Sequence, residues 1–149
     1  MRTFSYSQNL SPVKTSVRYP DYPRDRDGHI PEHLCFDVIR VRADFLIGYL
    51  WDMNGASISV SDITGAEEEE LDHDFENWAD RYNSLPVDES HDQIWESDDE
   101  RRVFDQDGAR LSKTLYDYLQ RKNTVVYRPT NGDETRFDAI GKTPVRLHD

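Results

Sequence analysis

Residues 45–60 read FLIGYLWDMNGASISV and carry the clearest structural pattern in the sequence. Aromatic and β-branched residues stand at every second position on both sides of Asn54-Gly55. Such alternation is typical of strands, and Asn-Gly tolerates the positive φ angles of a tight hairpin turn. The pattern predicts antiparallel strands near 44–51 and 57–63, with a further strand before them, near 35–42.

A helix is predicted after this hairpin. Its apolar residues recur at steps of four, three and four: Leu71, Phe75, Trp78 and Tyr82. Either Thr64 or Gly65 is expected to cap its first turn. The face opposite the apolar stripe carries acidic residues, which are expected to point outward: Asp72, Glu76 and Asp80.

The rest of the chain completes an α+β pattern. A second apolar stripe predicts a helix over about 105–122, after an acidic loop over 84–99. Strands over 124–128 and 135–140 flank a second Asn-Gly pair and form a second hairpin. We expect one domain over 1–149, with an antiparallel or mixed sheet built from two hairpins and two main helices on one face. Prolines make residues 1–33 a turn-rich lead-in or a short edge strand.

The negative charge is concentrated in one segment. The formal net charge is −12, but residues 66–107 hold 17 acidic and three basic residues, a balance of −14. The remaining 13 acidic and 15 basic residues leave a balance of +2. A surface of this sign repels nucleic acid and anionic membranes and attracts basic proteins. The segment is therefore either an interface for a basic partner or a solvated surface.

Motifs that would indicate catalysis or metal binding are missing from the sequence. Nucleotide-binding glycine loops and the Gly-x-Ser-x-Gly nucleophile pattern do not occur. Two Asp-x-Asp-Gly pieces, ending at Gly28 and Gly108, lack ligands at the first and last positions of a calcium loop. His73 and His91 each precede an Asp, without further ligands at suitable spacing. The sequence thus predicts no metal, no cofactor and no enzymatic activity.

Cysteine usage and hydropathy predict the compartment. Cys35 is the single cysteine, and its apolar neighbours favour a buried free thiol over a disulfide or a reactive group. No apolar run is long enough to span a membrane, and the first residues lack the apolar core of a secretory signal. We therefore expect a cytoplasmic protein without membrane contact.

Aromatic residues lie among the carboxylates of residues 66–107. Trp78 and Phe104 fit the helical stripes and are predicted to be core. Trp95 lies in the predicted loop, where Ile94 is its only apolar neighbour in the sequence. Interface anchors are typically Trp or Tyr surrounded by polar groups, so Trp95 is predicted to contact a partner.

In this acidic character the chain resembles the small immunity proteins of bacterial toxin–immunity systems of the contact-dependent inhibition type. The resemblance is carried by Glu67–Glu70, Asp72, Glu76, Asp88, Glu89, Asp92, Glu96 and Asp98–Glu100 beside Trp95. It implies binding and neutralisation of a basic toxin domain with nuclease activity, and no direct binding of nucleic acid. The expected contact residues are Asp72, Glu76, Asp80, Asp88, Glu89, Asp92, Trp95, Glu96, Asp98 and Asp99.

Two other classes of function stay open from the sequence. A carboxylate array also suits a nucleic-acid mimic, such as a phage inhibitor of restriction or CRISPR effectors, because it can imitate the phosphates of a duplex. The third class is an enzyme or regulatory domain in which the acidity is incidental. A mimic would inhibit several nucleic-acid-binding proteins or one effector with a basic channel, whereas an immunity protein would recognise one toxin.

Overall fold

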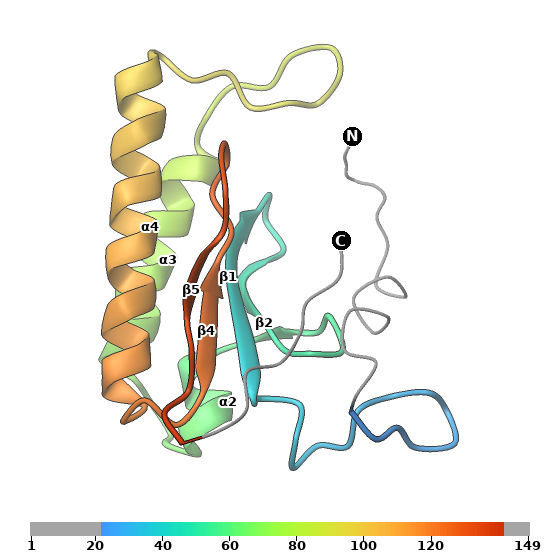
Figure 1. The fold of residues 1–149 in the computed structure, drawn as a ribbon. Helices are drawn as coiled ribbons and strands as arrows, with labels where there is room; N and C mark the ends of the chain where they lie inside the picture. Colours follow the sequence, from blue (N-terminus) through green and yellow to red (C-terminus); the bar gives the residue numbers. More distant parts are fainter. Residues whose placement is uncertain (1–21, 142–149) are drawn as a thin grey trace.

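The computed structural model describes residues 22–141, and Figure 1 shows their arrangement. The helices and strands follow the order β1 (Val38–Asp44), β2 (Gly48–Trp51), β3 (Ser57–Ile58), α2 (Val60–Thr64), α3 (Glu70–Asn83), α4 (Asp98–Tyr118), β4 (Thr124–Tyr127) and β5 (Thr135–Phe137). The predicted α+β class is confirmed. Of the predicted lead-in, residues 1–21 lie outside the described part, and residues 22–33 form turns and bends instead of a strand.

Two hairpins are joined into one mixed sheet, as predicted. The strand order is β3-β2-β1-β4-β5, with antiparallel pairs in each hairpin and a parallel pair between β1 and β4 at the centre. The β2–β3 turn contains Asn54-Gly55, and Gly55 has a φ of 82°. The Asp52 carboxylate fixes this turn by accepting hydrogen bonds from the amides of Asn54 and Ala56.

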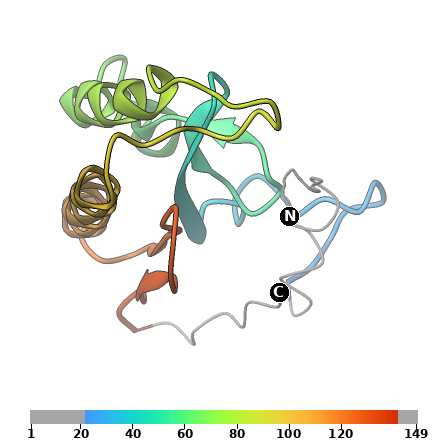
Figure 2. The same cartoon turned by 90° about the horizontal axis from the view of Figure 1, so that it is seen from above.

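Both long helices pack on one face of the sheet (Figures 1 and 2). The α3 helix contacts β1 and β2, and α4 contacts β4, β1 and β5. The predicted stripes are buried there, including Phe75, Trp78, Phe104 and Leu115. Trp78 and Phe104 stack with ring centroids 4.6 Å apart, so the prediction that both are core is confirmed.

The opposite face of the sheet is covered by residues that precede β1. Ile30 and Cys35 pack there against Val38 of β1 and Val126 of β4. Ile39, the next residue of β1, faces the helices instead. The central strands are therefore apolar on both sides, and the neighbouring residues Val38 and Ile39 are both buried.

Several predicted strand boundaries are wrong, among them the end of the last strand, which lies at Phe137 instead of 140. The first strand begins at Val38 instead of 35, because residues 34–37 form a turn. The second begins at Gly48, so Phe45–Ile47 form the β1–β2 turn. The strand predicted over 57–63 ends at Ile58, where Ser59 and Asp62 form a capping box that starts α2.

The helix starts also differ from the prediction. Thr64 ends α2 and Gly65 closes it in the left-handed conformation, whereas α3 begins only at Glu70. The second long helix begins at Asp98, seven residues before the predicted start, because Ser97 caps its first turn. Gly108 consequently lies inside α4. Within residues 22–141, no helix is both long and apolar enough to cross a membrane.

Candidate partner-binding surface

The acidic connection between α3 and α4, residues 84–97, is an ordered finger. Val87 and Gln93 form an antiparallel bridge, and the Ile94 amide donates to the Pro86 carbonyl at 2.8 Å. Asp88 organises the tip: its Oδ1 accepts from the amides of Ser90 (2.8 Å) and Asp92 (3.0 Å). We call residues 84–97 the acidic finger. Its internal hydrogen bonds fix the backbone that carries these carboxylates.

The first turn of α4 continues this acidic surface. Asp98 and Asp99 lie there, exposed to solvent. Glu100 reaches back so that its Oε1 accepts from the Glu96 amide at 2.7 Å, and Ser97 Oγ accepts from the Glu100 amide at 3.0 Å. Negative charge at a helix N-terminus is favourable because it faces the positive end of the helix dipole. The charges of Asp98 and Asp99 therefore stabilise the N-terminus of α4 in the free protein.

Trp95 anchors the finger to the body of the protein. Its ring centroid lies 5.2 Å from that of Phe104 and 6.2 Å from that of Tyr82, and the side chain is half-buried. Trp95 has more apolar contacts than the sequence indicated. The helix α4 starts earlier than predicted, and its Phe104 lies against Trp95. One side of Trp95 holds the finger in place, and contact of the other side with a partner stays a prediction.

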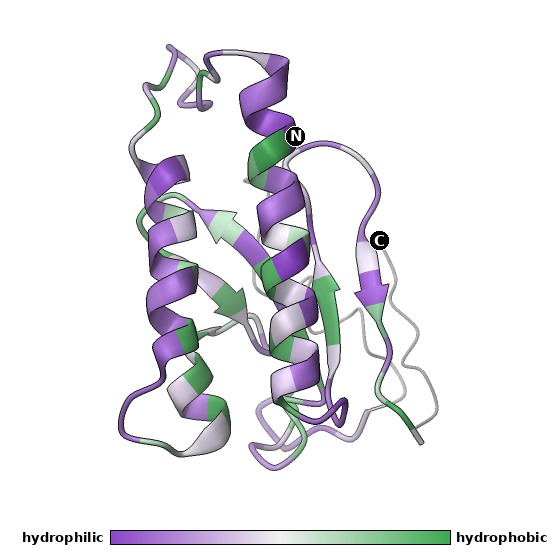
Figure 3. Ribbon diagram, turned by 90° about the vertical axis from the view of Figure 1, so that its left-hand side faces the viewer, coloured by the Kyte–Doolittle hydropathy of each residue, from purple (hydrophilic) through white to green (hydrophobic). Residues whose placement is uncertain are grey.

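Two of the three predicted outer residues of α3 are exposed. Glu76 and Asp80 face solvent, and Figure 3 shows hydrophilic residues along the outward sides of α3 and α4. A nearby ion pair between Arg81 and Asp107, 2.8 Å apart, links the two helices.

The prediction that Asp72 points outward is wrong. Its side chain is buried and holds the start of α2. Oδ1 accepts hydrogen bonds from the Val60 amide (2.7 Å) and the Tyr49 hydroxyl (3.0 Å). Oδ2 accepts from the amide and the hydroxyl of Ser61, both at 3.1 Å. Four donors converge on this carboxylate, so its role in the described structure is to join α2, α3 and β2.

The structure gathers most of the predicted contact residues at one end of the molecule, where α3 ends and α4 begins (Figure 1). These residues are Asp88, Glu89, Asp92, Trp95, Glu96, Asp98 and Asp99. Asp80 lies one turn before the end of α3, and Glu76 lies one turn before Asp80. Asp72 does not belong to this surface, because its side chain is buried. Asp99 pairs with Arg102 at 3.1 Å, an exposed pair that leaves the surface strongly negative.

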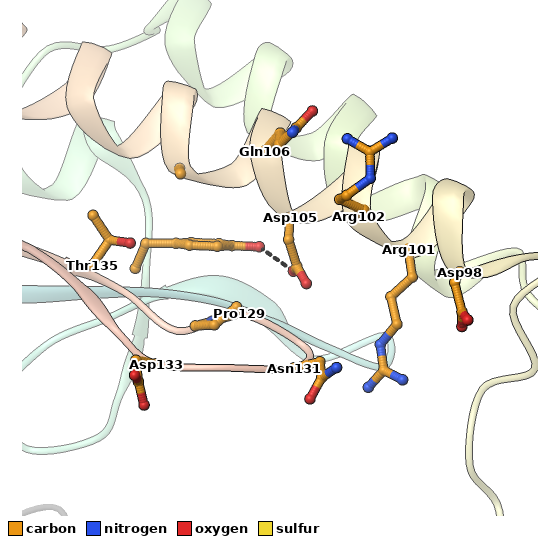
Figure 4. A pocket seen from close by; sticks show the side chains of 11 residues that line it. Asp98, Arg101, Arg102, Asp105, Gln106, Pro129, Asn131, Asp133 and Thr135 are labelled. Atoms are coloured by element: carbon orange, nitrogen blue, oxygen red, sulfur yellow. Dashed lines mark hydrogen bonds between the residues drawn. The ribbon is translucent and has the colours of Figure 1, made fainter.

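A polar pocket of about 500 Å³ lies between the first half of α4 and the β4–β5 connection (Figure 4). Its main polar groups already have partners within the protein. Asp105 accepts from the Tyr127 hydroxyl (2.7 Å) and from the amide and hydroxyl of Thr130 (2.9 and 2.7 Å). Arg101 donates to the Thr130 carbonyl and hydroxyl. The hydrogen bonds around the pocket therefore hold α4 against the β4–β5 hairpin.

His73 approaches two carboxylates, those of Glu68 at 3.7 Å and Glu76 at 3.6 Å, on an exposed surface. Among residues 22–141, no three His, Cys, Asp or Glu side chains are grouped closely enough to hold a metal ion. Within that part of the chain, the carboxylates are spread over a surface and do not converge on a point.

A comparison with protein families gives a match over the same region. The model of the family described as CdiI_serr, Serratia CdiI immunity protein-like, matches residues 37–130. Within residues 22–141, the match covers β1 to β4, the helices α2, α3 and α4, and the acidic finger. No curated protein matches the sequence.

Proposed function

Since the chain belongs to the Serratia CdiI immunity protein-like family, we propose that it binds and neutralises one cognate toxin domain whose surface is basic and whose activity is that of a nuclease. The resemblance to immunity proteins noted in the sequence is confirmed by this family. The basic nature of the partner is inferred from charge: residues 66–107 carry a balance of −14, and exposed carboxylates of this segment include those of the acidic finger and the first turn of α4.

The mechanism follows from this charge. Nucleases that act on DNA or RNA need a basic surface for the phosphate backbone. Carboxylates carried on a fixed backbone attract such a surface over several ångströms and accelerate encounter. The bound immunity protein then occupies the nucleic-acid channel or its rim, so it inhibits by occupancy and without chemistry of its own. The same proposal places the protein in the cytoplasm, where a toxin would reach nucleic acid.

The test uses the candidate cognate toxin domain, which we expect to be encoded immediately upstream of this gene. We expect the purified protein to abolish its nuclease activity at one-to-one stoichiometry and to leave an unrelated nuclease active. Raising the salt from about 50 to about 300 mM should slow association several-fold, because exposed charges are screened beyond the Debye length. Stoichiometric mixing with no inhibition would exclude the immunity function, and inhibition of unrelated nucleases would favour a nucleic-acid mimic.

A matched pair of charge reversals localises the effect. Glu89→Lys with Asp92→Lys changes two carboxylates of the acidic finger, and Asp27→Lys with Glu32→Lys changes two exposed ones before β1. Both double variants shift the net charge by the same amount. We expect only the finger variant to slow association at low salt by about tenfold or more. Equal slowing by both would assign the effect to net charge alone.

A further inference from the structure

The β1–β2 turn exposes three consecutive apolar side chains. Phe45, Leu46 and Ile47 are 40%, 72% and 62% exposed. Soluble proteins leave single apolar residues at the surface routinely, but contiguous apolar patches mark interaction sites. We call residues 45–47 the apolar turn. The alternating pattern predicts these residues to lie in a strand over 44–51, so their exposure is not expected from the sequence.

The backbone of the apolar turn is held in a conformation that favours display. Leu46 has a φ of 59°, in the left-handed region that leucine rarely adopts. Its amide donates to Asn83 Oδ1 at 3.0 Å, and the Ile47 amide donates to the Asp44 carbonyl at 3.0 Å. The side chain of Asn83 therefore fixes a strained turn whose most exposed residue is a leucine.

The apolar turn lies beside the acidic finger. Asn83 is the last residue of α3, and the finger starts at the next position. Burial raises the pKa of Tyr82, and the carboxylates of Asp44, at the end of β1, and Asp92, in the finger, raise it further. Asp44, the residue before the apolar turn, and Asp92 of the finger thus both act on the Tyr82 hydroxyl. Figure 1 shows the finger and the β1–β2 turn at the same end of the molecule.

The finger adds apolar groups of its own to this end. Val87 and Ile94 are exposed there, among Asp88, Glu89 and Asp92. Protein interfaces commonly combine an apolar centre, which is fully desolvated in the complex, with a polar rim that excludes water. Apolar side chains next to uncompensated carboxylates match that arrangement for a partner that carries an apolar pocket bordered by Lys and Arg.

We propose that the apolar turn is the anchor of the toxin complex and inserts into an apolar pocket of the toxin whose basic border faces the acidic finger. The inference rests on the proposed function and assigns separate roles in binding to the acidic finger and the apolar turn. Carboxylates of the finger set the association rate, because long-range attraction acts before contact. Phe45–Ile47 set the dissociation rate, because their burial is lost only when the complex separates.

The decisive variant is Leu46→Asn. Asparagine adopts the left-handed region more readily than leucine, so the fold is retained and the melting temperature stays equal or rises. The matched control is Ile140→Asn, which removes an apolar side chain that is 64% exposed and lies near the end of α4, where its amide bonds to the Arg121 carbonyl. Association and dissociation rates with the upstream-encoded toxin domain are measured at two salt concentrations for both variants.

We expect Leu46→Asn to raise the dissociation rate at least tenfold, with the association rate and its salt dependence within twofold of the unmodified protein. Ile140→Asn should change neither rate. An unmodified protein that binds the toxin, combined with a Leu46→Asn variant that dissociates within twofold of it, would overturn the anchor while leaving the immunity function intact. A dimer of the free protein that Leu46→Asn converts to monomer would also overturn it, because the turn would then serve a second copy. Absence of toxin binding by the unmodified protein would instead reject the proposed function itself.

Discussion

The aromatic ring of Tyr127 lies so close to the backbone of Gly108 that a Cβ at position 108 would stand 2.4 Å from Cε1 of the ring. Tyr127 is buried on β4, stacks edge-on to Trp78 and donates its hydroxyl to Asp105. The ring is thus held from several sides, and α4 approaches the sheet this closely only because residue 108 has no side chain.

Gly108→Ala should therefore destabilise the protein by about 2 kcal/mol or more in urea denaturation. The direction is informative, because the same change inside an exposed helix would stabilise by about 1 kcal/mol through helix propensity. In a Tyr127→Leu background, where the ring is removed, the substitution should be neutral or stabilising. Equal destabilisation in both backgrounds would mean that the clash with Tyr127 is not the cause.

Asp72 gives a second prediction about stability. Asp72→Ala removes the acceptor for four donors, two of them backbone amides at the start of α2. Buried donors left without partners cost about 1–3 kcal/mol each, and water entry offsets part of this, so we expect a loss of about 2–4 kcal/mol. Asp74→Ala, an exposed carboxylate two residues away, removes the same charge and should change stability by less than about 0.5 kcal/mol. A similar melting temperature for both variants would contradict the structural role of Asp72.

Local signals in the sequence predicted the sheet and the helix stripes well. Asn54-Gly55 marks a real hairpin, and the stripe from Leu71 to Tyr82 faces the core. Two helix starts were also encoded but overlooked. Ser59 and Ser97 each precede an acidic residue by three positions, the spacing of a capping box, and each caps a helix. These two pairs predict that the third strand ends before Ser59 and that α4 begins at Asp98.

Other features depend on tertiary contacts that no local pattern contains. Asp72 sits on the predicted polar face of its helix, and only the placement of α2 against that face turns it into a buried acceptor. Leu46 looks like a strand residue, and only the hydrogen bond to Asn83, 37 residues later, fixes it in an exposed turn. Long-range partners of this kind decide which acidic and apolar side chains are left for a partner.

Cys35 gives a prediction about pH. The thiol is buried and free, as predicted, and donates to the Glu32 carbonyl at 3.3 Å. Burial, aided by the carboxylate of Asp52, raises the pKa of Cys35 to about 11 from an ordinary value of 9.0. Because the thiolate is the reactive form, the native protein at pH 8 should react with iodoacetamide on the order of a hundredfold more slowly than the urea-unfolded chain. Comparable rates would mean an accessible, ionised thiol.

The same shift fixes the sign of a stability effect. Below pH 9 the thiol is protonated in both the folded and the unfolded states, so its contribution is fully present. As the pH rises from 9 toward 11, the unfolded chain loses the proton first, and stability falls. Cys35→Ala should therefore reduce the loss of stability between pH 9 and 11, measured by urea denaturation at each pH. An unchanged slope would show that other groups, such as buried tyrosines, account for the alkaline loss.

Trp95 connects the stability of the finger to binding. In Trp95→Ala the contacts with Phe104 and Tyr82 are lost, and because the ring is only half-buried we expect a loss of about 2 kcal/mol of stability without unfolding. Toxin binding should weaken by a further amount, on the order of 2 kcal/mol, because the backbone of the finger loses its fixed position and must be ordered on binding.

Two further variants separate support from direct contact. Trp95→Phe keeps a ring against Phe104 and should retain most of the stability, whereas Ile94→Ala removes an exposed neighbour and should leave stability unchanged. If Trp95 acts by holding the finger, Trp95→Phe also retains most of the affinity. If Trp95 touches the toxin directly, Trp95→Phe loses affinity while its melting temperature stays close to that of the unmodified protein. Unchanged affinity in Trp95→Ala would mean that toxin binding depends neither on Trp95 nor on the acidic finger that it supports. The apolar turn would then have to provide the affinity without the finger.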